Sequence, residues 1–252
     1  MISDFIFVQK KAFINTFKKI KYIPILTLHL LAYNILYYLA TILISRILGA
    51  SYFVGSFLAY IVKVFITSAS LYVLARIVLS NNLKLLEIKD FLDNGKKYLS
   101  PLFTAFFTYY IIELLISLVT SPNSGLIGNL IITFLLYITF SAVLESIYIS
   151  EKFSYDSINE GINFIVNNFI NWVFPNTLIF LFLFFLFNQI LIFPYLLVNL
   201  GIVYNFKIFN LLANYKIMPV IILFILSFLL VYKGELYKIL AFSNRRKRSY
   251  NK

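Results

Sequence analysis

Cysteine is absent from this sequence of 252 residues, and histidine occurs once, at His29. Without cysteine there is no disulfide and no thiolate, and one histidine is too few for the Cys/His clusters that hold zinc. Charge is also scarce: Asp, Glu, Lys and Arg make up 13% of the residues, against about a quarter in soluble domains. These absences exclude thiol chemistry, a Cys/His metal site and an ordinary water-soluble fold.

Common catalytic motifs are missing as well. The sequence has no Gly-rich phosphate loop, no HExxH, no serine flanked by glycines and no carboxylate pair with a histidine. Enzymes that work inside a membrane need clusters of His, Asp or Arg within or just below their spans. We therefore expect a protein that is not an enzyme, without catalytic residues, a metal or a cofactor.

Apolar residues dominate what remains. They make up 61% of the chain, in runs of about 20 that are each long enough to cross a hydrocarbon core about 30 Å thick as a helix. Turn signals between these runs predict six spans, at residues 22–46, 52–79, 101–120, 126–149, 172–197 and 217–239. The predicted fold class is all-α: one polytopic integral membrane domain over residues 1–252, with no cleaved signal peptide.

Lysine and arginine predict the orientation of these spans, because they are retained on the cytoplasmic side. With both termini inside, the inner segments hold eighteen of the 22 Lys and Arg: Lys10, Lys11, Lys18, Lys19, Lys21, Arg76, Lys84, Lys89, Lys96, Lys97, Lys152, Lys233, Lys238, Arg245, Arg246, Lys247, Arg248 and Lys252. The outer segments hold only Arg46, Lys207 and Lys216, and Lys63 lies within a span. This split predicts a multi-pass protein of a bacterial cytoplasmic membrane. The net charge of +12 then indicates anionic lipid as a partner rather than nucleic acid.

Three amphipathic segments each precede a pair of spans. Two read DFIFVQKKAFINTF (residues 4–17) and DFLDNGKKYLSPLF (90–103), and a third, DSINEGINFIVNNF (156–169), keeps the first Asp and the last Phe. At helical spacing their apolar and polar residues fall on opposite faces, which is typical of helices lying on a membrane surface. Ser157 and Glu160 predict a capping box in the third segment.

These segments divide the chain into three units of one surface helix and two spans. The units cover residues 1–80, 84–150 and 153–240, a layout that indicates internal triplication. A plainer interpretation is that any inner loop before a span tends to be amphipathic and basic.

In layout the chain resembles a bacterial membrane domain. An amphipathic helix followed by a span hairpin is the unit seen in KDFLDNGKKYLSPLF and YDSINEGINFIVNNFINWVF. This unit is similar to the six-span domain that precedes the catalytic domain of some glycerophosphodiester phosphodiesterases. It is also similar to stand-alone uncharacterised relatives of that domain. The resemblance implies a six-span inner-membrane fold. It implies no catalysis, because residues 1–252 leave no room for a phosphodiesterase barrel or its acidic metal ligands.

Polar residues inside the spans are the candidate site, since each costs free energy unless it faces protein or water. At 1.5 Å per residue, Lys63 and Glu113 both fall about 3 to 5 Å outside the midplane, where they are able to meet. Glu145 falls about 12 Å toward the cytoplasm, at the depth of the inner headgroups, and His29 lies near the inner end of its span. An ion pair of Lys63 and Glu113 either fixes helix order or couples ion movement.

Two functions from different classes follow. The first is a non-enzymatic integral membrane protein that contacts lipid or serves as a membrane subunit for a cytoplasmic or membrane partner. The alternative is a transporter or permease subunit, in which Lys63, Glu113 and a polar seam on several spans line a path. The two differ in whether a water-filled cavity reaches the charged pair.

Overall fold

The computed structural model describes residues 2–48, 52–80, 96–119, 125–187 and 218–243, and within these ranges every regular element is a helix. The elements are α1 (Ile2–Lys18), η1 (Ile20–Tyr22), α2 (Ile23–Leu48), α3 (Tyr52–Ala75), η2 (Arg76–Ser80), α5 (Leu99–Val119), α6 (Gly125–Phe140), α7 (Val143–Ile149), α8 (Ser154–Asn167), α9 (Phe169–Phe187) and α12 (Met218–Phe242). The predicted all-α class is confirmed for these ranges.

Two helices of the described chain are long and apolar enough to cross a membrane, Ile20–Ile47 and Phe57–Ser80. A third candidate arises if α8 and α9 are counted as one span, although they are bent by 101°. Length and composition therefore support two or three spans. Helices do begin and end near most of the six predicted ranges, but six spans remain a prediction.

Two boundaries differ from the sequence-based expectation. The predicted continuous span at residues 126–149 is interrupted at Ser141 and Ala142, which separate α6 from α7. The predicted capping box is wrong, because α8 begins at Ser154 and the Ser157 hydroxyl donates to the Ser154 carbonyl at 2.6 Å inside the first turn. A serine within a helix often bonds back to its own backbone in this way.

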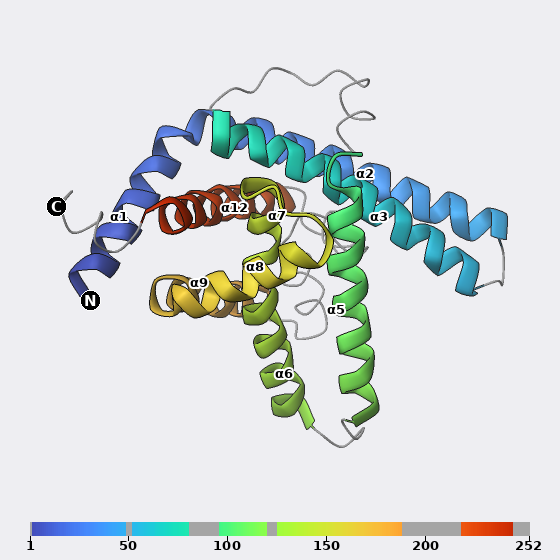
Figure 1. Ribbon diagram of the computed structural model, residues 1–252. Coiled ribbons are helices and arrows are strands. Elements are labelled where there is room, and N and C mark those ends of the chain that lie inside the picture. Colours follow the sequence, from blue (N-terminus) through green and yellow to red (C-terminus); the bar gives the residue numbers. More distant parts are fainter. Residues whose placement is uncertain (1, 49–51, 81–95, 120–124, 188–217, 244–252) are drawn as a thin grey trace.

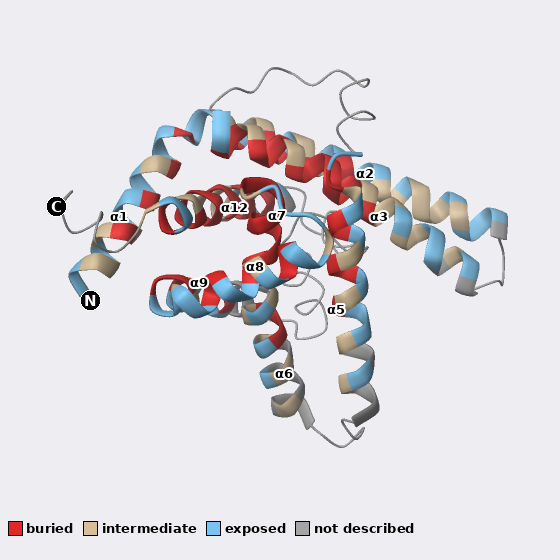
Figure 2. Cartoon of the chain, viewed as in Figure 1, coloured by how far each residue is buried: buried red, intermediate tan, exposed pale blue. Residues whose placement is uncertain are grey.

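Figure 1 shows how the helices are arranged. The antiparallel helices α2 and α3 form one hairpin, and α5 and α6 extend in another direction. Figure 2 shows that buried residues gather around α12 and α7, where the near ends of α2, α3 and α5 meet, whereas the far ends of both helix pairs are more exposed. The core is therefore a central hub, from which apolar helices extend.

Helix α1 packs along α12 through one narrow face. Val8, Ala12 and Thr16, four residues apart, are buried there. At 100° per residue the neighbouring face carries an exposed apolar stripe, which we call the α1 stripe: Ile2, Ile6, Phe13, Phe17 and Ile20. The predicted single apolar face is thus split: Ala12 is buried against protein, and the stripe is exposed, with Phe13 and Phe17 also touching Phe228 of α12 edge-on.

Helix α8 divides its apolar residues in the same way. Ile158 and Ile165 are buried, whereas Ile162 and Val166 are exposed, and Phe169 at the start of α9 is also exposed. The second predicted surface helix lies mostly outside the described residues, as do the four basic residues at 245–248 and residues 121–124 between the third and fourth predicted spans. The threefold repeat therefore stays a prediction.

Candidate functional site

Among the described residues, the most deeply buried charged side chains are centred on Lys233-Gly234-Glu235 of α12. Because neighbouring residues of a helix point about 100° apart, Lys233 and Glu235 leave α12 on different sides. Lys233 pairs with Glu145 of α7, and Glu235 pairs with Lys19, which follows α1. We call these four side chains and Gly234 the α12 polar centre.

Lys233 is buried among polar and aromatic groups. Its Nζ is 3.7 Å from Glu145 Oε1, and the two side chains are 2% and 1% exposed. The same Nζ donates a hydrogen bond of 3.0 Å to the Ser141 carbonyl. It also lies 5.9 Å and 5.5 Å from the ring centres of Tyr137 and Trp172, within the range of cation–π attraction.

The surroundings of Lys233 coincide with the break between α6 and α7. Trp172, the only tryptophan of the chain, donates from Nε1 to the Ser141 hydroxyl at 2.8 Å, while Lys233 bonds the carbonyl of the same residue. Backbone groups at an interrupted helix need partners of this kind when they are buried. Lys233 and Trp172 therefore stabilise the break.

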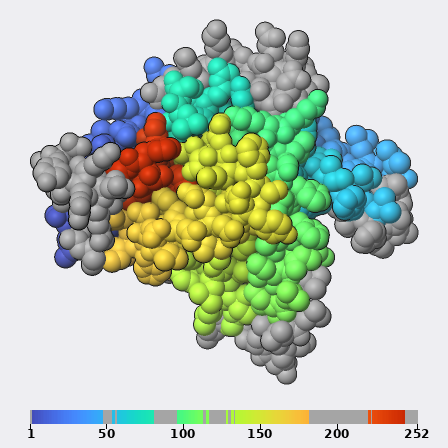
Figure 3. Space-filling view, viewed as in Figure 1, coloured from blue at the N-terminus to red at the C-terminus, as the bar shows by residue number. Residues whose placement is uncertain are grey.

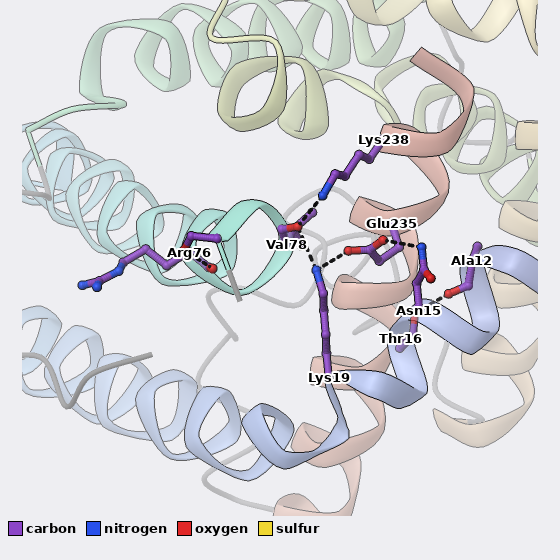
Figure 4. A network of polar contacts seen from close by, with 9 residues as sticks. Ala12, Asn15, Thr16, Lys19, Arg76, Val78, Glu235 and Lys238 are labelled. Carbon is purple, nitrogen blue, oxygen red and sulfur yellow. Dashed lines mark hydrogen bonds and ion pairs between the residues drawn. The ribbon is translucent and has the colours of Figure 1, made fainter. Parts of the chain in front are cut away.

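The second ion pair, Lys19 with Glu235, lies beside the end of α3 (Figure 4). Lys19 Nζ donates to a carboxylate oxygen of Glu235 and, at 2.8 Å, to the Val78 carbonyl. Asn15 Nδ2 donates to the other oxygen of Glu235 at 3.1 Å. Burial lowers the pKa of Lys19 from its usual value, and the hydrogen bond to Glu235 opposes that effect.

Val78 belongs to η2, a single π-helical turn that ends α3. Its carbonyl accepts hydrogen bonds from two ammonium groups, Lys19 at 2.8 Å and Lys238 at 3.1 Å. Carbonyls in the last turn of a helix have no following turn to pair with. Both halves of the α12 polar centre thus have the same construction: a lysine bonds a carbonyl where a helix is irregular, and a glutamate neutralises that lysine.

Gly234 allows α12 to approach its neighbours. A Cβ at this position would lie 2.4 Å from the Tyr148 hydroxyl and 2.8 Å from a Val78 methyl group. The Tyr148 hydroxyl and Glu145 Oε2 are buried atoms of the described chain for which the structure shows no hydrogen-bond partner. The side chains around Gly234 are therefore packed for close contact, with two polar atoms left unsatisfied.

Of the predicted site residues, Glu145 has a different setting from the one expected. The sequence places it at the inner headgroups, but the structure buries it in the hub against Lys233. His29 is half-buried on α2, where Nδ1 donates to the Ile25 carbonyl of the preceding turn at 2.8 Å and the ring packs edge-on against Tyr33. His29 thus bonds its own helix.

Lys63 lies on α3, half-buried, with Nζ 5.7 Å from the centre of the Phe106 ring. Phe106 is seven residues before Glu113 on α5, which is roughly 10 Å along a helix. The side chain of Glu113 lies outside the described part of the structure, so the pair of Lys63 and Glu113 stays a prediction.

Sequence reasoning missed the main members of the α12 polar centre. It counted Lys19 and Lys233 among the charges of the inner segments, yet they are 6% and 2% exposed. A signal was present, because Lys-Gly-Glu occurs inside the apolar run at residues 217–239, where a charge requires a partner. Glu145, the other glutamate in an apolar run near the inner face, was the available partner for Lys233.

Chemically, the α12 polar centre is suited to holding helices together. Its lysines and glutamates are paired with each other and with backbone carbonyls, so they are not arranged as an acid, a base and a nucleophile around an open cavity. Among the described residues no three His, Asp or Glu side chains lie close enough to hold a metal ion.

Comparisons of this chain with protein families, with curated proteins and with solved structures find no match.

Proposed function

We propose that this chain is a non-enzymatic integral protein of a bacterial cytoplasmic membrane, which acts through contact with lipid or as a membrane subunit for a partner protein. The observation that carries this proposal is the α1 stripe. Ile2, Ile6 and Phe13 are 75%, 58% and 49% exposed, along a helix whose Lys11 and Lys18 point to the opposite side. An exposed apolar stripe beside basic residues suits the surface of an anionic membrane.

Exposed apolar residues on the helices that extend from the hub agree with this proposal. On α2 they are Leu39, Leu43 and Ile47, and on α6 they are Ile131 and Leu135. Large exposed apolar surfaces mark contact with a membrane or with another protein. Six spans with both termini inside, and relationship to the six-span domain of the phosphodiesterases, form part of the proposal.

The buried charges support a structural role rather than a transport path. Lys233, Glu145, Lys19 and Glu235 each have a partner inside the hub. A buried charge that is used to hold a helix break is not available to bind a passing substrate. This supports the first of the two functions over the transporter alternative.

The test is to purify the full chain in a mild detergent and to count and identify the bound lipids by native mass spectrometry. We expect several phospholipids per chain in the parent. Replacing Ile2 and Ile6 together by asparagine should lower the total, since both side chains are exposed. As a matched control, replacing Lys11 and Lys18 by asparagine should lower only the number of bound anionic lipids. An unchanged lipid count in the first variant would contradict the proposal.

A further inference from the structure

A polar cleft lies where the end of α8, the start of α9 and the end of α12 meet. Its volume is about 560 Å³, which is within the range of small-molecule sites. Figure 3 shows these three elements, in yellow, orange and red, side by side on one face of the molecule. The polar residues that line the cleft are Glu160, Asn163, Asn167, Asn168, Asn171 and Ser243.

The charge of this cleft is opposite to that of the chain. The sequence has 22 Lys and Arg against 10 Asp and Glu, yet the lining contains one carboxylate, Glu160, and none of the described residues that line it is Lys or Arg. Among the described lining residues there is no cation to offset the repulsion between Glu160 and a bound anion that carries no cation of its own. The lining therefore favours a cationic ligand.

Two of the lining asparagines use their amide nitrogen for a hydrogen bond within the protein. Asn171 Nδ2 donates to Asp4 Oδ2 at 3.3 Å, and Asn168 Nδ2 donates to the Phe164 carbonyl at 3.1 Å. One N–H of each amide is thus used within the protein, and each amide oxygen is an acceptor for a ligand's hydrogen. A primary ammonium, which has three donors and no acceptor, matches two amide oxygens and a carboxylate.

Apolar side chains flank these polar groups. Val166 and Phe169, which also line the cleft, are 69% and 58% exposed. A ligand with a polar head and an apolar tail would place each part against matching residues.

We propose that this cleft binds a primary ammonium group, of which the ethanolamine headgroup of a membrane lipid is the source that the apolar rim favours. The choice of a lipid as the source rests on the proposed function, whereas recognition of the ammonium does not. Glu160 supplies the opposite charge, and Asn168 and Asn171 supply the neutral acceptors.

The experiment uses the purified full chain in a nonionic detergent. Short-chain phosphatidylethanolamine, phosphatidylcholine and phosphatidylglycerol with the same acyl chains are titrated, and apparent Kd values are measured by native mass spectrometry. We expect phosphatidylethanolamine to bind about ten-fold more tightly than either of the others, because a trimethylated ammonium donates no hydrogen bond and glycerol carries no cation. Glu160→Gln should remove this preference. The control Asp156→Asn, one turn earlier on α8, exposed and outside the cleft lining, should retain it.

Equal affinities for the three lipids, tighter binding of phosphatidylglycerol, or an unchanged preference in Glu160→Gln would each overturn the ammonium site while leaving lipid contact intact. A titration with glycerophosphoethanolamine, which has the headgroup but no acyl chains, separates recognition of the ammonium from recognition of a lipid. If glycerophosphoethanolamine binds in a Glu160-dependent manner as tightly as the lipid, the ammonium site is supported and its source is a soluble amine, which counts against the lipid function.

Discussion

At the scale of single residues, the pair of Lys233 and Glu145 has the largest expected effect on stability. The two side chains are almost fully buried and 3.7 Å apart. Removing one partner of such a pair strands the other charge in a medium of low dielectric constant, which costs about 3 to 5 kcal/mol. The loss of Lys233 would also remove the hydrogen bond to the Ser141 carbonyl at the helix break.

We therefore predict that Lys233→Met and Glu145→Gln each lower the free energy of unfolding by about 3 to 5 kcal/mol, and that the double variant loses less than the sum. Denaturant titration in detergent micelles measures all three values. Lys97→Met with Glu151→Gln is the control, because that pair is 47% and 60% exposed and such pairs contribute at most about 1 kcal/mol. Strictly additive losses for Lys233 and Glu145 would show that the two charges do not interact.

A second residue-scale prediction concerns Gly234. Its Cβ in Gly234→Ala would meet the Tyr148 hydroxyl and a Val78 methyl group, and overpacking of this kind costs about 1 to 3 kcal/mol. Tyr148→Phe removes a hydroxyl for which the structure shows no hydrogen bond, so by itself it should change stability little.

The double variant Gly234→Ala with Tyr148→Phe should recover part of the loss, as measured by thermal unfolding in detergent. Gly161→Ala is the matched control, because a Cβ there meets the backbone of Val143 at 3.1 Å, which Tyr148→Phe does not relieve. If Tyr148→Phe restores both glycine variants equally, the steric contact is not the cause.

At the scale of elements, the surface helices show how one amphipathic segment serves two contacts. Helix α1 buries Val8 and Ala12 against α12, and α8 buries Ile158 and Ile165 in the hub. Their remaining apolar residues stay exposed. A helix held in this way lies against protein on one side and presents an adjacent side to lipid.

We predict that spin labels at Phe13 on α1 and Ile162 on α8 report immersion at headgroup depth, because both side chains are exposed and apolar. A label at Lys11, on the opposite side of α1, should report aqueous surroundings. Relaxation by oxygen and by a water-soluble nickel complex in liposomes gives the depth. The expected immersion at Leu92 concerns a residue outside the described ranges. Free aqueous mobility at Phe13 and Ile162 would contradict the surface location.

At the scale of the whole molecule, segments predicted to share the cytoplasmic side meet in the hub. Lys19, Val78 and Lys238 form one network, and Lys97 before α5 pairs with Glu151 after α7 at 2.9 Å. From this hub the α2–α3 hairpin and the helices α5 and α6 extend in different directions (Figure 1). The side of the membrane on which these segments lie stays a prediction from the distribution of Lys and Arg.

We predict that a reporter active only in the cytoplasm works when fused after Lys252, and that a periplasm-dependent reporter works when inserted at Asn123. The reason is the distribution of Lys and Arg, which the positive-inside rule converts into an orientation. As the control, both reporters are fused at both positions, and immunoblots show that the fusion proteins are expressed at equal levels. Activity of the periplasmic reporter after Lys252 would be incompatible with an even number of spans.

Much of the fold was predictable from local patterns. Apolar runs and turn residues located helices such as α2, α3 and α12 to within a few residues, because backbone hydrogen bonds and hydropathy act over short stretches of chain. The same patterns missed the break at Ser141, since its partners, Trp172 and Lys233, are 31 and 92 residues away.

By itself, the sequence determined the helical class, the apolar composition and the amphipathic faces, all of which depend on residues within a few turns of one another. Only the tertiary structure decided which charges are buried and with what they pair. Spacing placed Glu145 at the headgroups, and the count of Lys and Arg assigned Lys233 to the inner segments, whereas the packing of α12 against α7 buries both. The physical reason is that a charge in an apolar run must find a partner, and that partner is chosen by contacts between helices far apart in the chain.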